Sequence, residues 1–410
     1  MSRRVVITGL GCVTPLGSVE ETWSRLTAGE SGTGPLTVFD AAPYHSRVAG
    51  EVRNFDPTAY LEQRQVTALP RQAQFALVAA QDALRDAGIG ALSDPERTGI
   101  FLGTSIGPLA TTTVQQSIFT EKGITRVHPM GPAHNYPGVA GSEVAIHTGV
   151  TGPVMTVSTA CTSGADAIGL GLLHIRAGIV DLAVVGASEA PLFPLLFAAF
   201  DRLGLMSRWR GDPRQACRPF AADRLGIVLS EGAAMCVLEA EDAARRRNAP
   251  ILAELAGFGA TCDAHHQLHQ LPSGAEAVRA MRLALCDAQI GPSEIDYISA
   301  HGTGTPANDP IETAAVKQVL GERAYAVPMS SIKSMTGHLM GACGPLELIA
   351  SVKALREGVL PPTINLDVAD PTCDLDYVPN RAREARVRSV MSNTFGFGSR
   401  NASIVLRAPA

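Results

Sequence analysis

The 410-residue sequence lacks three features, and each absence excludes a class of protein. None of its eight cysteines forms a C-x-x-C pair, so their spacing indicates neither a disulfide framework nor a thiolate zinc site. The sequence has no run of roughly 18 or more apolar residues, the length that a membrane span needs. Its net charge of −5 gives no general reason to bind nucleic acid or an anionic membrane. We therefore expect a cytoplasmic protein with no nucleic-acid or membrane partner.

Length and composition indicate a globular protein with more than one structural unit. Apolar residues make up 46% of the chain and charged residues 18%, an ordinary globular balance. Basic residues at the N-terminus precede only a few apolar residues, too few for the hydrophobic segment of a signal peptide. Because the chain is long for one simple core, we expect two domains or one duplicated domain.

Apolar spacing predicts two series of alternating strands and helices. In the first series we expect strands at 4–8, 98–104, 153–157, 181–187 and 233–238, and helices at 20–28, 71–87, 138–148, 163–176, 194–203 and 241–247. In the second series we expect strands at 251–258, 296–300, 327–331, 386–393 and 402–407, and helices at 275–287, 310–320 and 344–357. Residues 108–137 are poorly periodic, and no element is predicted there.

Two segments of the chain match each other weakly. Gly164–Gly178 can be aligned with Gly344–Gly358, because the first glycine, an arginine and the last glycine coincide and apolar residues recur at matched offsets. Each segment follows a short predicted strand. The match indicates two similar α/β halves, with active groups meeting where the equivalent helices face each other.

One cysteine lies at the junction between a short strand and a helix. Cys161 follows the predicted buried strand 153–157 and precedes the helix expected to begin at Ser163. A thiol in the first turn of a helix faces unpaired N–H groups and the positive end of the helix dipole, which favours the thiolate. Small neighbours would let a substrate carbonyl approach, as at a nucleophile elbow. A buried structural cysteine is the alternative.

Two further strand ends carry ionisable side chains. His301 follows the strand 296–300 and is flanked by glycine, which favours a place in a cleft rather than in a core. Lys333 and His338 follow the strand 327–331, and their five-residue spacing could direct both toward one site. The alternatives are a surface histidine, a solvated lysine and a core histidine.

Taken together, the three strand ends predict a particular chemistry. A cysteine alone supports acyl transfer, so the two additional imidazoles, at positions 301 and 338, imply a second step in which charge develops. Two neutral histidines that donate Nε2–H to one carbonyl oxygen would stabilise an enolate, and each such donor is worth roughly 3–4 kcal/mol. An enolate beside an acyl-cysteine is the arrangement that carbon–carbon bond formation requires.

A glycine-rich segment near the C-terminus completes this set. In Asn393–Ser399, glycines flank Phe397 and permit close backbone approach and a mobile ring. An amide N–H of this segment could form an oxyanion hole with the amide of Cys161. A plain hairpin turn is the alternative.

These motifs jointly resemble those of the elongating β-ketoacyl-[acyl carrier protein] synthases, including the ketosynthase subunit of bacterial type II polyketide synthases. The resemblance covers essentially the full length and is carried by Thr159–Gly164, His301–Thr305 and Lys333–His338. It implies an α/β protein of the thiolase fold, with duplicated α/β halves in a layered αβαβα arrangement. Residues 1–250 would form the half that carries Cys161, and residues 251–410 the half that carries His301, Lys333 and His338.

The resemblance implies a role for each catalytic residue. Cys161 would accept the acyl chain from a carrier-protein thioester. His301 and His338 would bind the malonyl thioester carbonyl and stabilise the enolate left by decarboxylation. Lys333, together with Glu312, would maintain the electrostatics of the site and hold His338 in place.

The resemblance also assigns the surrounding residues. Phe397 would be the gate beside the cysteine, and its N–H would form the oxyanion hole with that of Cys161. Thr303 and Thr305 would contact the phosphopantetheine arm. The other substrate-binding residues, along the acyl pocket, would be Ile106, Phe200 and Phe395.

The implied reaction is a decarboxylative Claisen condensation. An acyl chain on Cys161 would combine with malonyl-[acyl carrier protein] to give 3-oxoacyl-[acyl carrier protein], in type II polyketide or fatty-acid chain elongation. No metal and no permanently bound cofactor is implied, because the substrates arrive on the phosphopantetheine of an acyl carrier protein. The partners would be that carrier protein and either a second copy of this chain or a paralogue similar to a chain-length factor.

The sequence departs from the family pattern at three places. Ser399-Arg400 stands where Gly-Thr or Gly-His is usual, Leu268 where a threonine is usual, and Arg224-Leu225-Gly226 where Arg-Asp-Gly is usual. These departures bear on the geometry of the phosphopantetheine arm and on substrate range, not on the catalytic set. The segment Pro129–Gly138 matches the housekeeping fatty-acid enzymes poorly, which favours a specialised pathway.

Surface charge and histidine content suggest two further sites. Five arginines could form a basic rim for an acidic carrier protein, although scattered solvated arginines are an equal alternative: Arg64, Arg71, Arg202, Arg208 and Arg210. The short run Asp263, His265, His266 and His269 could suggest zinc, but the implied chemistry needs no metal and we expect none.

Two other functions compete with condensation. A coenzyme A-dependent thiolase needs a second catalytic cysteine, for which Cys343 is the candidate, but the two histidines and the lysine argue against it. A non-catalytic chain-length partner typically lacks the nucleophile, whereas Cys161 is present here.

Overall fold

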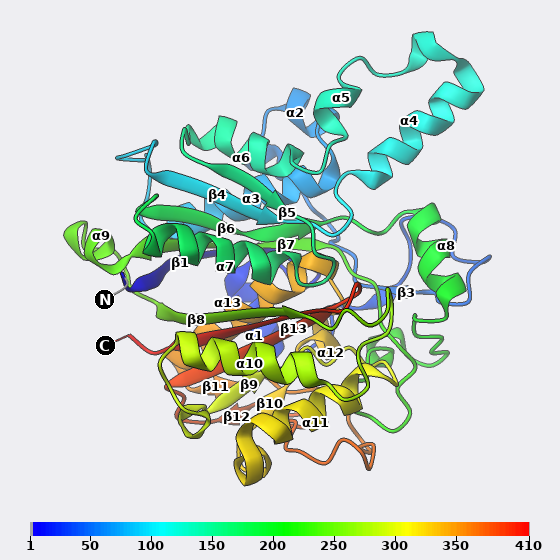
Figure 1. The fold of residues 1–410 in the computed structure, drawn as a ribbon. Helices are drawn as coiled ribbons and strands as arrows, with labels where there is room; N and C mark the ends of the chain where they lie inside the picture. The colour runs from blue at the N-terminus through cyan, green and yellow to red at the C-terminus, as the bar shows by residue number, and fades with distance from the viewer. Residues whose placement is uncertain (1–2, 410) are drawn as a thin grey trace.

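Ten strands form one mixed sheet in a computed structural model that describes residues 3–409 (Figure 1). The spatial order is β10–β9–β13–β14–β8–β1–β7–β6–β4–β5. In chain order, the first five strands of this sheet are β1 (Val5–Val13), β4 (Thr98–Gly103), β5 (Val154–Val157), β6 (Leu182–Glu189) and β7 (Gly232–Ala240). The other five are β8 (Ala253–Cys262), β9 (Tyr297–Ser299), β10 (Met329–Ser330), β13 (Ser389–Gly396) and β14 (Arg400–Arg407).

The two sets of five strands have the same topology. If the strands of each set are numbered one to five in chain order, their spatial order from the outer edge of the sheet to its middle is third, second, fourth, fifth, first. In each set the third, second and fourth strands are parallel, while the fourth and fifth, and the fifth and first, are antiparallel. The two sets are joined only by the short pairing of Val6 with Glu254 and Ile7 with Ala253. Because both sets have the same topology, the sheet is a duplication.

Helices cover both sets on both faces. The outer face of the first set carries α3 (Arg71–Asp86) and α6 (Val139–Thr148), and that of the second carries α10 (Ala275–Asp287) and α11 (Asn308–Leu320). Between the two sets lie α7 (Ser163–Arg176) and α13 (Cys343–Glu357), the segments whose sequences match (Figure 1). This confirms the predicted layered α/β architecture with duplicated halves.

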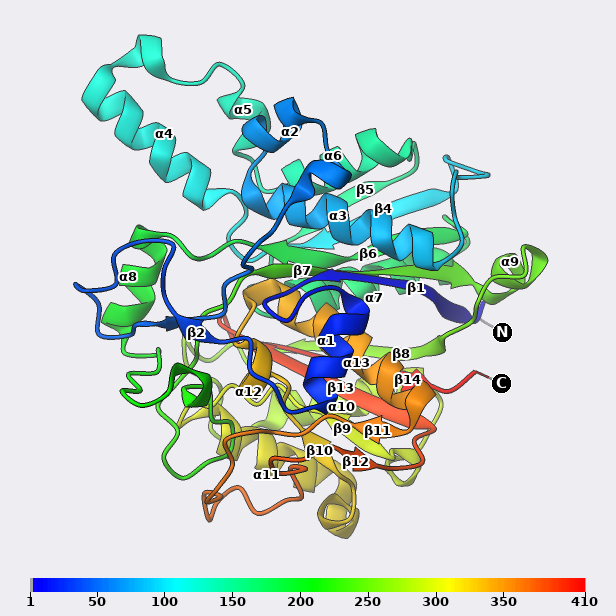
Figure 2. The ribbon, with the colours of Figure 1, turned by 180° about the vertical axis from the view of Figure 1, so that it is seen from behind.

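The remaining elements lie around this frame. Helix α1 (Val19–Thr27) packs beside α13 and is best seen from behind (Figure 2). Helices α8 (Pro194–Leu203) and α9 (Glu241–Arg246) lie near their predicted positions. The short elements are α2 (Gln63–Ala68), α5 (Gly131–His134), α12 (Lys333–Thr336), β2 (Gly34–Pro35), β3 (Val48–Ala49), β11 (Val359–Leu360) and β12 (Arg383–Glu384). Within residues 3–409, no helix is both long and apolar enough to cross a bilayer.

The central helices approach closely because small residues face each other at their crossing. A Cβ atom at Gly164 would lie 2.4 Å from Cδ of Pro345, and one at Gly344 would lie 3.2 Å from Cβ of Ala165. The two glycines that the sequence comparison aligned therefore lie at the same contact. This contact brings the N-termini of both helices, and the loops before them, to one place.

Besides shifted strand ends and unpredicted short elements, three parts of the chain differ most from the sequence-based expectation. Strand β1 continues to Val13, because its glycines pack against a helix instead of making a turn. A Cβ atom at Gly9 would lie 2.1 Å from the carbonyl oxygen of Ala83 in α3. Strand β5 is the edge of the sheet rather than a buried strand, and Met155 is 41% exposed. The unpredicted helix α4 (Leu109–Lys122) extends away from the body and has no buried residue (Figure 1).

We predict that Gly164→Ala destabilises the fold. The added methyl group would overlap the Pro345 ring, which cannot move without displacing α13, so the free energy of unfolding should fall by about 1–3 kcal/mol. Urea unfolding followed by circular dichroism measures the change. The control is Gly90→Ala, because a Cβ atom at Gly90 meets no heavy atom within 4 Å. An unchanged midpoint for Gly164→Ala would contradict the close crossing.

Candidate active site

The strand-to-helix turn before α7 presents the nucleophile candidate. Ala160 adopts φ +56°, in the left-handed region, and the chain turns there from β5 into α7. The hydroxyls of Ser105 and Ser163 both donate to the carbonyl oxygen of Ala160, at 2.7 and 2.5 Å. These bonds hold the strained residue next to Cys161, whose side chain is buried. The geometry is that of the predicted nucleophile elbow.

The protonation state of Cys161 differs from the expectation. Burial raises the pKa of its thiol to about 11, although the backbone N–H of Phe397 and the charge of Lys333 both act to lower it. The thiol form therefore predominates at neutral pH, in contrast to the thiolate that the helix position favours. The sequence argument failed because it took account of the helix dipole but not of the desolvation around the sulfur.

Two imidazoles lie in the same cavity as the sulfur. Cys161, His301 and His338 all line a cavity of about 300 Å³, and both histidines are buried. The two rings are 5.8 Å apart between centroids and nearly perpendicular, at 84°. His301 follows β9, and His338 lies between α12 and α13. The sequence predicted this convergence of three residues that are far apart in the chain.

Hydrogen bonds fix the tautomer of each ring. The backbone N–H of Met340 donates to Nδ1 of His338 at 3.0 Å, so this nitrogen is an acceptor. Nδ1 of His301 lies 3.2 Å from Nζ of Lys333, an ammonium that has no acceptor to offer, so this nitrogen is an acceptor too. Each neutral ring must then carry its proton on Nε2. The site therefore holds two imidazole Nε2–H donors.

Electrostatics keeps both rings neutral. Burial and the charge of Lys333 lower the pKa of His338 to about 3. The same two causes hold the pKa of His301 well below its ordinary value, and His338 adds to them. Because a lowered pKa favours the neutral form above that value, neither ring acquires a second proton near pH 7.

Lys333, whose charge keeps these rings neutral, is itself buried and forms an ion pair with a carboxylate. Lys333 is 1% exposed, and its ammonium donates to Oε1 of Glu347 and, at 2.6 Å, to the carbonyl oxygen of His301. Burial works against the charge of Lys333, but the carboxylate of Glu347 outweighs it and raises the pKa of the lysine. The site thus contains a fixed positive charge.

The partners of Lys333 correct two sequence-based assignments. Glu312 was expected beside Lys333, but its carboxylate accepts from the backbone N–H groups of His301 and Gly302, both at 2.8 Å. Glu312 therefore holds the loop that carries His301, and Glu347 pairs with the lysine. Lys333 contacts His301 rather than His338. The only sequence signal for Glu347 is a carboxylate within a helix that is otherwise largely apolar.

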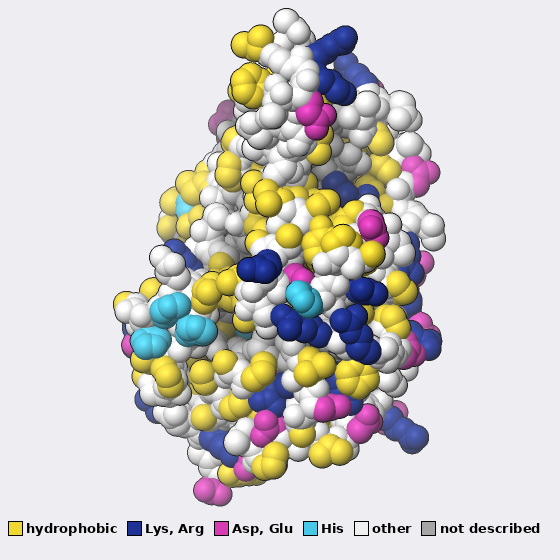
Figure 3. Space-filling model, turned by 90° about the vertical axis from the view of Figure 1, so that its right-hand side faces the viewer, with side chains coloured by type: hydrophobic (Ala, Val, Ile, Leu, Met, Phe, Trp, Pro, Cys, Tyr) yellow, Lys and Arg dark blue, Asp and Glu magenta, His cyan; other side chains and the backbone are white. Residues whose placement is uncertain are grey.

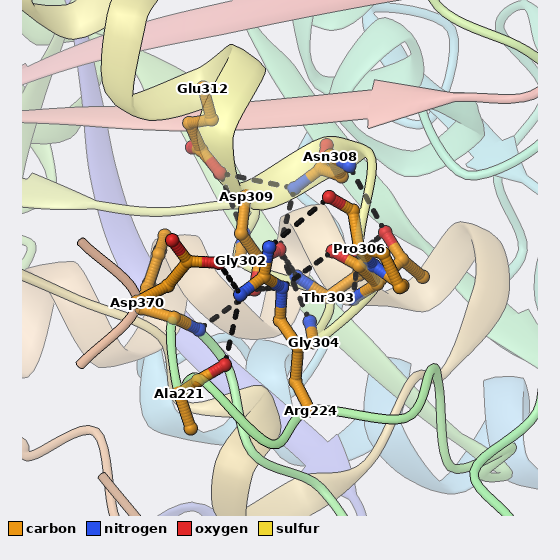
Figure 4. A network of polar contacts seen from close by, with 12 residues as sticks. Ala221, Arg224, Gly302, Thr303, Gly304, Pro306, Asn308, Asp309, Glu312 and Asp370 are labelled. Carbon is orange, nitrogen blue, oxygen red and sulfur yellow. Dashed lines mark hydrogen bonds and ion pairs between the residues drawn. The ribbon is translucent and has the colours of Figure 1, made fainter. Parts of the chain in front are cut away.

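A second buried network holds the loop after His301 (Figure 4). Asp309 accepts from the backbone N–H groups of Thr303 and Gly304, at 3.1 and 3.2 Å, and from that of Phe220 at 2.8 Å. The buried guanidinium of Arg224 donates to the carbonyl oxygens of residues 221, 305 and 306 and to the carboxylate of residue 370. Arg224, although followed by an unusual leucine, thus fixes the loop that carries two cavity-lining threonines.

The cavity contains most of the predicted substrate-binding residues. Its lining includes Phe200, Thr303, Thr305, Phe395 and Phe397. Ile106 does not line it and instead packs in the apolar cluster beside it. The rings of Phe397 and Phe200 stack at 6.0 Å between centroids. A Cβ atom at position 396 would lie 3.1 Å from the backbone nitrogen of residue 161, so a glycine there lets the two segments approach.

Some lining residues were not predicted from the sequence. Leu268, His269 and Gln270 line the cavity, and Leu205 and Met340 add apolar surface. The signals in this segment were the substitution of leucine for the usual threonine and the run of histidines that includes His269. His266, proposed and discounted as a zinc ligand, accepts at Nδ1 from the backbone N–H groups of residues 268 and 269. Within residues 3–409, no group of three or more His, Cys, Asp or Glu side chains is placed to hold a metal ion.

The five arginines that could form a basic rim differ in their ion pairs. Arg71 is paired with the buried carboxylate of Glu231 at 2.8 Å, and Arg64 with Glu62 at 3.0 Å. Both side chains are nevertheless exposed, as are those of the other three: Arg202, Arg208 and Arg210. These three flank the cavity-lining residues 204 and 205, and Figure 3 shows basic side chains gathered beside the hollowed part of this face.

Family models match nearly the whole chain. Residues 2–244 match the β-ketoacyl synthase N-terminal domain, and residues 252–367 match the β-ketoacyl synthase C-terminal domain. The chain is 45% identical to the tetracenomycin polyketide synthase ketoacyl synthase alpha subunit of Streptomyces glaucescens, over 99% of this chain and 97% of that protein. It is 41% identical to 3-oxoacyl-[acyl-carrier-protein] synthase 2 of Synechocystis sp., over 99% and 98%.

Solved structures with the same fold cover the whole chain. A type II polyketide acyl-carrier protein in complex with its ketosynthase bound to a hexaketide contains a chain with a TM-score of 0.92 and 35% identity, covering 100% of both chains. The ishigamide ketosynthase/chain length factor matches with a TM-score of 0.92 and 38% identity, again over 100% of both chains. These matches confirm the predicted thiolase fold.

We predict that alkylation of Cys161 by iodoacetamide accelerates steeply at high pH. A pKa raised to about 11 leaves little thiolate at neutral pH, so the rate should rise by about tenfold per pH unit up to pH ~10. Peptide mass spectrometry after timed quenching gives the rate, and the exposed Cys262 and Cys286 serve as internal controls. A rate that reaches a plateau below pH ~8 would show that the thiolate predominates instead.

Proposed function

We propose a decarboxylative condensation centred on Cys161 for this chain, which belongs to the β-ketoacyl synthase family. The chain is an acyltransferase that joins an acyl group to the two-carbon unit of malonyl-[acyl carrier protein] and forms 3-oxoacyl-[acyl carrier protein]. The observation that carries the assignment is one cavity holding a cysteine and two imidazole Nε2–H donors. Acyl transfer needs the first, and enolate formation needs the other two.

In the first half-reaction, the sulfur of Cys161 attacks the carbonyl carbon of an acyl thioester. The thiol proton passes to the departing phosphopantetheine sulfur, so the carrier leaves as a free thiol and the acyl group stays on the enzyme. The backbone N–H groups of Cys161 and Phe397 form hydrogen bonds to the sulfur. We assign them as donors to the oxyanion that forms beside it. Glycine at position 396 permits this approach.

In the second half-reaction, the malonyl thioester carbonyl accepts hydrogen bonds from the Nε2–H groups of His301 and His338. Carbon dioxide leaves, and the electron pair of the broken bond forms an enolate whose oxygen these donors stabilise. The enolate carbon then attacks the acyl carbon on Cys161, and the sulfur leaves as a thiolate that takes up a proton from water. Lys333 holds Nδ1 of His301 as an acceptor, which keeps the donor proton on Nε2.

The remaining cavity residues fit the arm and its carrier. We assign Thr303 and Thr305, whose hydroxyls are 2.9 Å apart, to the phosphopantetheine arm. We assign the exposed Arg202, Arg208 and Arg210 to the acidic surface of the carrier protein. A relative is described in complex with its acyl carrier protein.

We infer that the edge of the sheet receives a partner chain. Strand β5 leaves a row of backbone groups open at the edge, and helix α4 has no buried side chain. Val114 and Phe119 of α4 are 57% and 49% exposed, an apolar surface that association would cover. The partner is a second copy of this chain or a paralogue, as in the ketosynthase/chain length factor to which the chain is similar.

Two further expectations stay proposals. We propose that the catalytic halves are residues 1–250, which carry Cys161, and residues 251–410, which carry His301, Lys333 and His338. The duplicated strand order supports this division. The cysteines that the structure describes are all free thiols, which fits a reducing cytoplasm.

The two competing functions have less support. Cys343, the candidate second cysteine of a thiolase, is buried 3.8 Å from Nδ1 of His338, on the side of the ring away from Nε2, and does not line the cavity. A non-catalytic chain-length partner would have no use for the elbow that presents Cys161.

We predict that two single substitutions separate the half-reactions. Cys161→Ala should abolish condensation but keep malonyl decarboxylation, because both imidazole donors remain. His301→Ala removes one of two enolate donors and should slow decarboxylation by roughly 10²–10³-fold while Cys161 still accepts an acyl group. Intact mass of the enzyme reports acylation, and carbon dioxide release reports decarboxylation. Carbon–carbon bond formation by Cys161→Ala would refute the proposed function.

A further inference from the structure

A buried carboxylate behind the nucleophile has no part in the reaction described above. Glu189, the last residue of β6, is 0% exposed. The donors that hold it are all neutral: the backbone N–H groups of Ser105 and Gly341, the latter at 3.2 Å, and the hydroxyl of Thr104 at 3.3 Å. Because burying a carboxylate is costly unless hydrogen bonds compensate it, this arrangement needs a reason.

One of these donors leads to the nucleophile. Glu189 fixes the backbone of Ser105, and the hydroxyl of Ser105 donates to the carbonyl oxygen of Ala160 at 2.7 Å. Ala160 is the left-handed residue that directs the chain into Cys161. A shift of the loop after β4 would therefore release one of the two bonds that hold the elbow.

The other backbone donor leads to a catalytic imidazole. Gly341 follows Met340, whose N–H donates to Nδ1 of His338 and so keeps its proton on Nε2. Met340 adopts φ +52°, so this turn is strained as the elbow is. A Cβ atom at position 341 would lie 2.8 Å from Oε1 of Glu189, which shows how closely the carboxylate and the turn approach.

We propose that Glu189 is a positioning residue of this active site. Its carboxylate ties the elbow of Cys161, which belongs to the N-terminal half, to the turn of His338, which belongs to the C-terminal half. It thereby keeps the sulfur and the ring in register across the boundary between the halves. The proposal rests on the proposed function, because only a site that uses both groups needs that register.

Burial raises the pKa of Glu189 to about 7, so above that pH its charge acts in addition to its hydrogen bonds. It raises the pKa of Cys161, whereas the charge of Lys333 lowers it. Glutamine has the same shape and can accept both backbone N–H groups with its carbonyl oxygen, but it carries no charge. Substitution by alanine removes the bonds and the charge together. The two variants therefore separate positioning from electrostatics.

The test measures both half-reactions in Glu189→Ala and Glu189→Gln. In folded Glu189→Ala, acylation of Cys161 and malonyl decarboxylation should each slow by about ten- to a hundredfold, with little change in KM. Glu189→Gln should restore both rates to within about threefold of wild type and shift the pH profile of Cys161 alkylation to lower pH by about one unit. The matched control is Ser188→Ala, which removes a buried 2.6 Å bond to the carbonyl oxygen of Gln72 on the opposite face of β6.

Several outcomes would overturn the proposal. Wild-type rates of both half-reactions in folded Glu189→Ala, or the loss of only one of them, would show that the carboxylate does not link the two groups. An unshifted pH profile of Cys161 alkylation in Glu189→Gln would show that the charge of Glu189 does not act on the thiol. If Glu189→Ala does not fold, Ser105→Ala tests the bond through which the carboxylate would act on the elbow: acylation should slow by about tenfold with decarboxylation intact, and unchanged acylation would contradict the proposed link. A wild-type enzyme that performs neither half-reaction would instead refute the proposed function.

Discussion

The site depends on one buried positive charge. Lys333 is almost fully enclosed, and Glu347 compensates it from the central helix α13. From that position the ammonium makes Nδ1 of His301 an acceptor, lowers the pKa of both imidazoles and favours the thiolate of Cys161. A solvated lysine could do none of this, because water would screen its charge and bond its ammonium. Lysine is scarce in this chain, and an ammonium is a compact point charge, whereas an arginine presents a planar fork of donors.

Duplication explains why residues so distant in sequence meet. In each half, a helix follows a strand and points its N-terminus toward the centre, and the two helices cross at glycines. Cys161 precedes one helix and His338 precedes the other, so the crossing brings a nucleophile and a hydrogen-bond donor together. The backbone N–H groups at both helix ends add donors to the same place. The condensation that we propose uses groups from both halves, and neither half could perform it alone.

The sequence predicted those features that local chemistry determines. It placed α7 at Ser163–Arg176 as found, because small residues and a strand end mark its start, and it selected Cys161, His301 and His338 as one site. It failed where tertiary packing decides. The choice between Glu312 and Glu347 as partner of Lys333 depends on which helix crosses the lysine, and the pKa of Cys161 depends on burial. Helix α4 escaped prediction because no face of it is buried, so no apolar period marks it.

The central claim is that two neutral imidazoles present Nε2–H to the cavity that holds the sulfur. Nitrogen-15 NMR of histidine-labelled enzyme measures it most directly, because the two ring nitrogens of each tautomer resonate differently, and His301→Ala and His338→Ala assign the signals. The account predicts that both rings at pH ~7 are neutral, with Nε2 protonated and Nδ1 free. An Nδ1–H tautomer or an imidazolium at either position would contradict it.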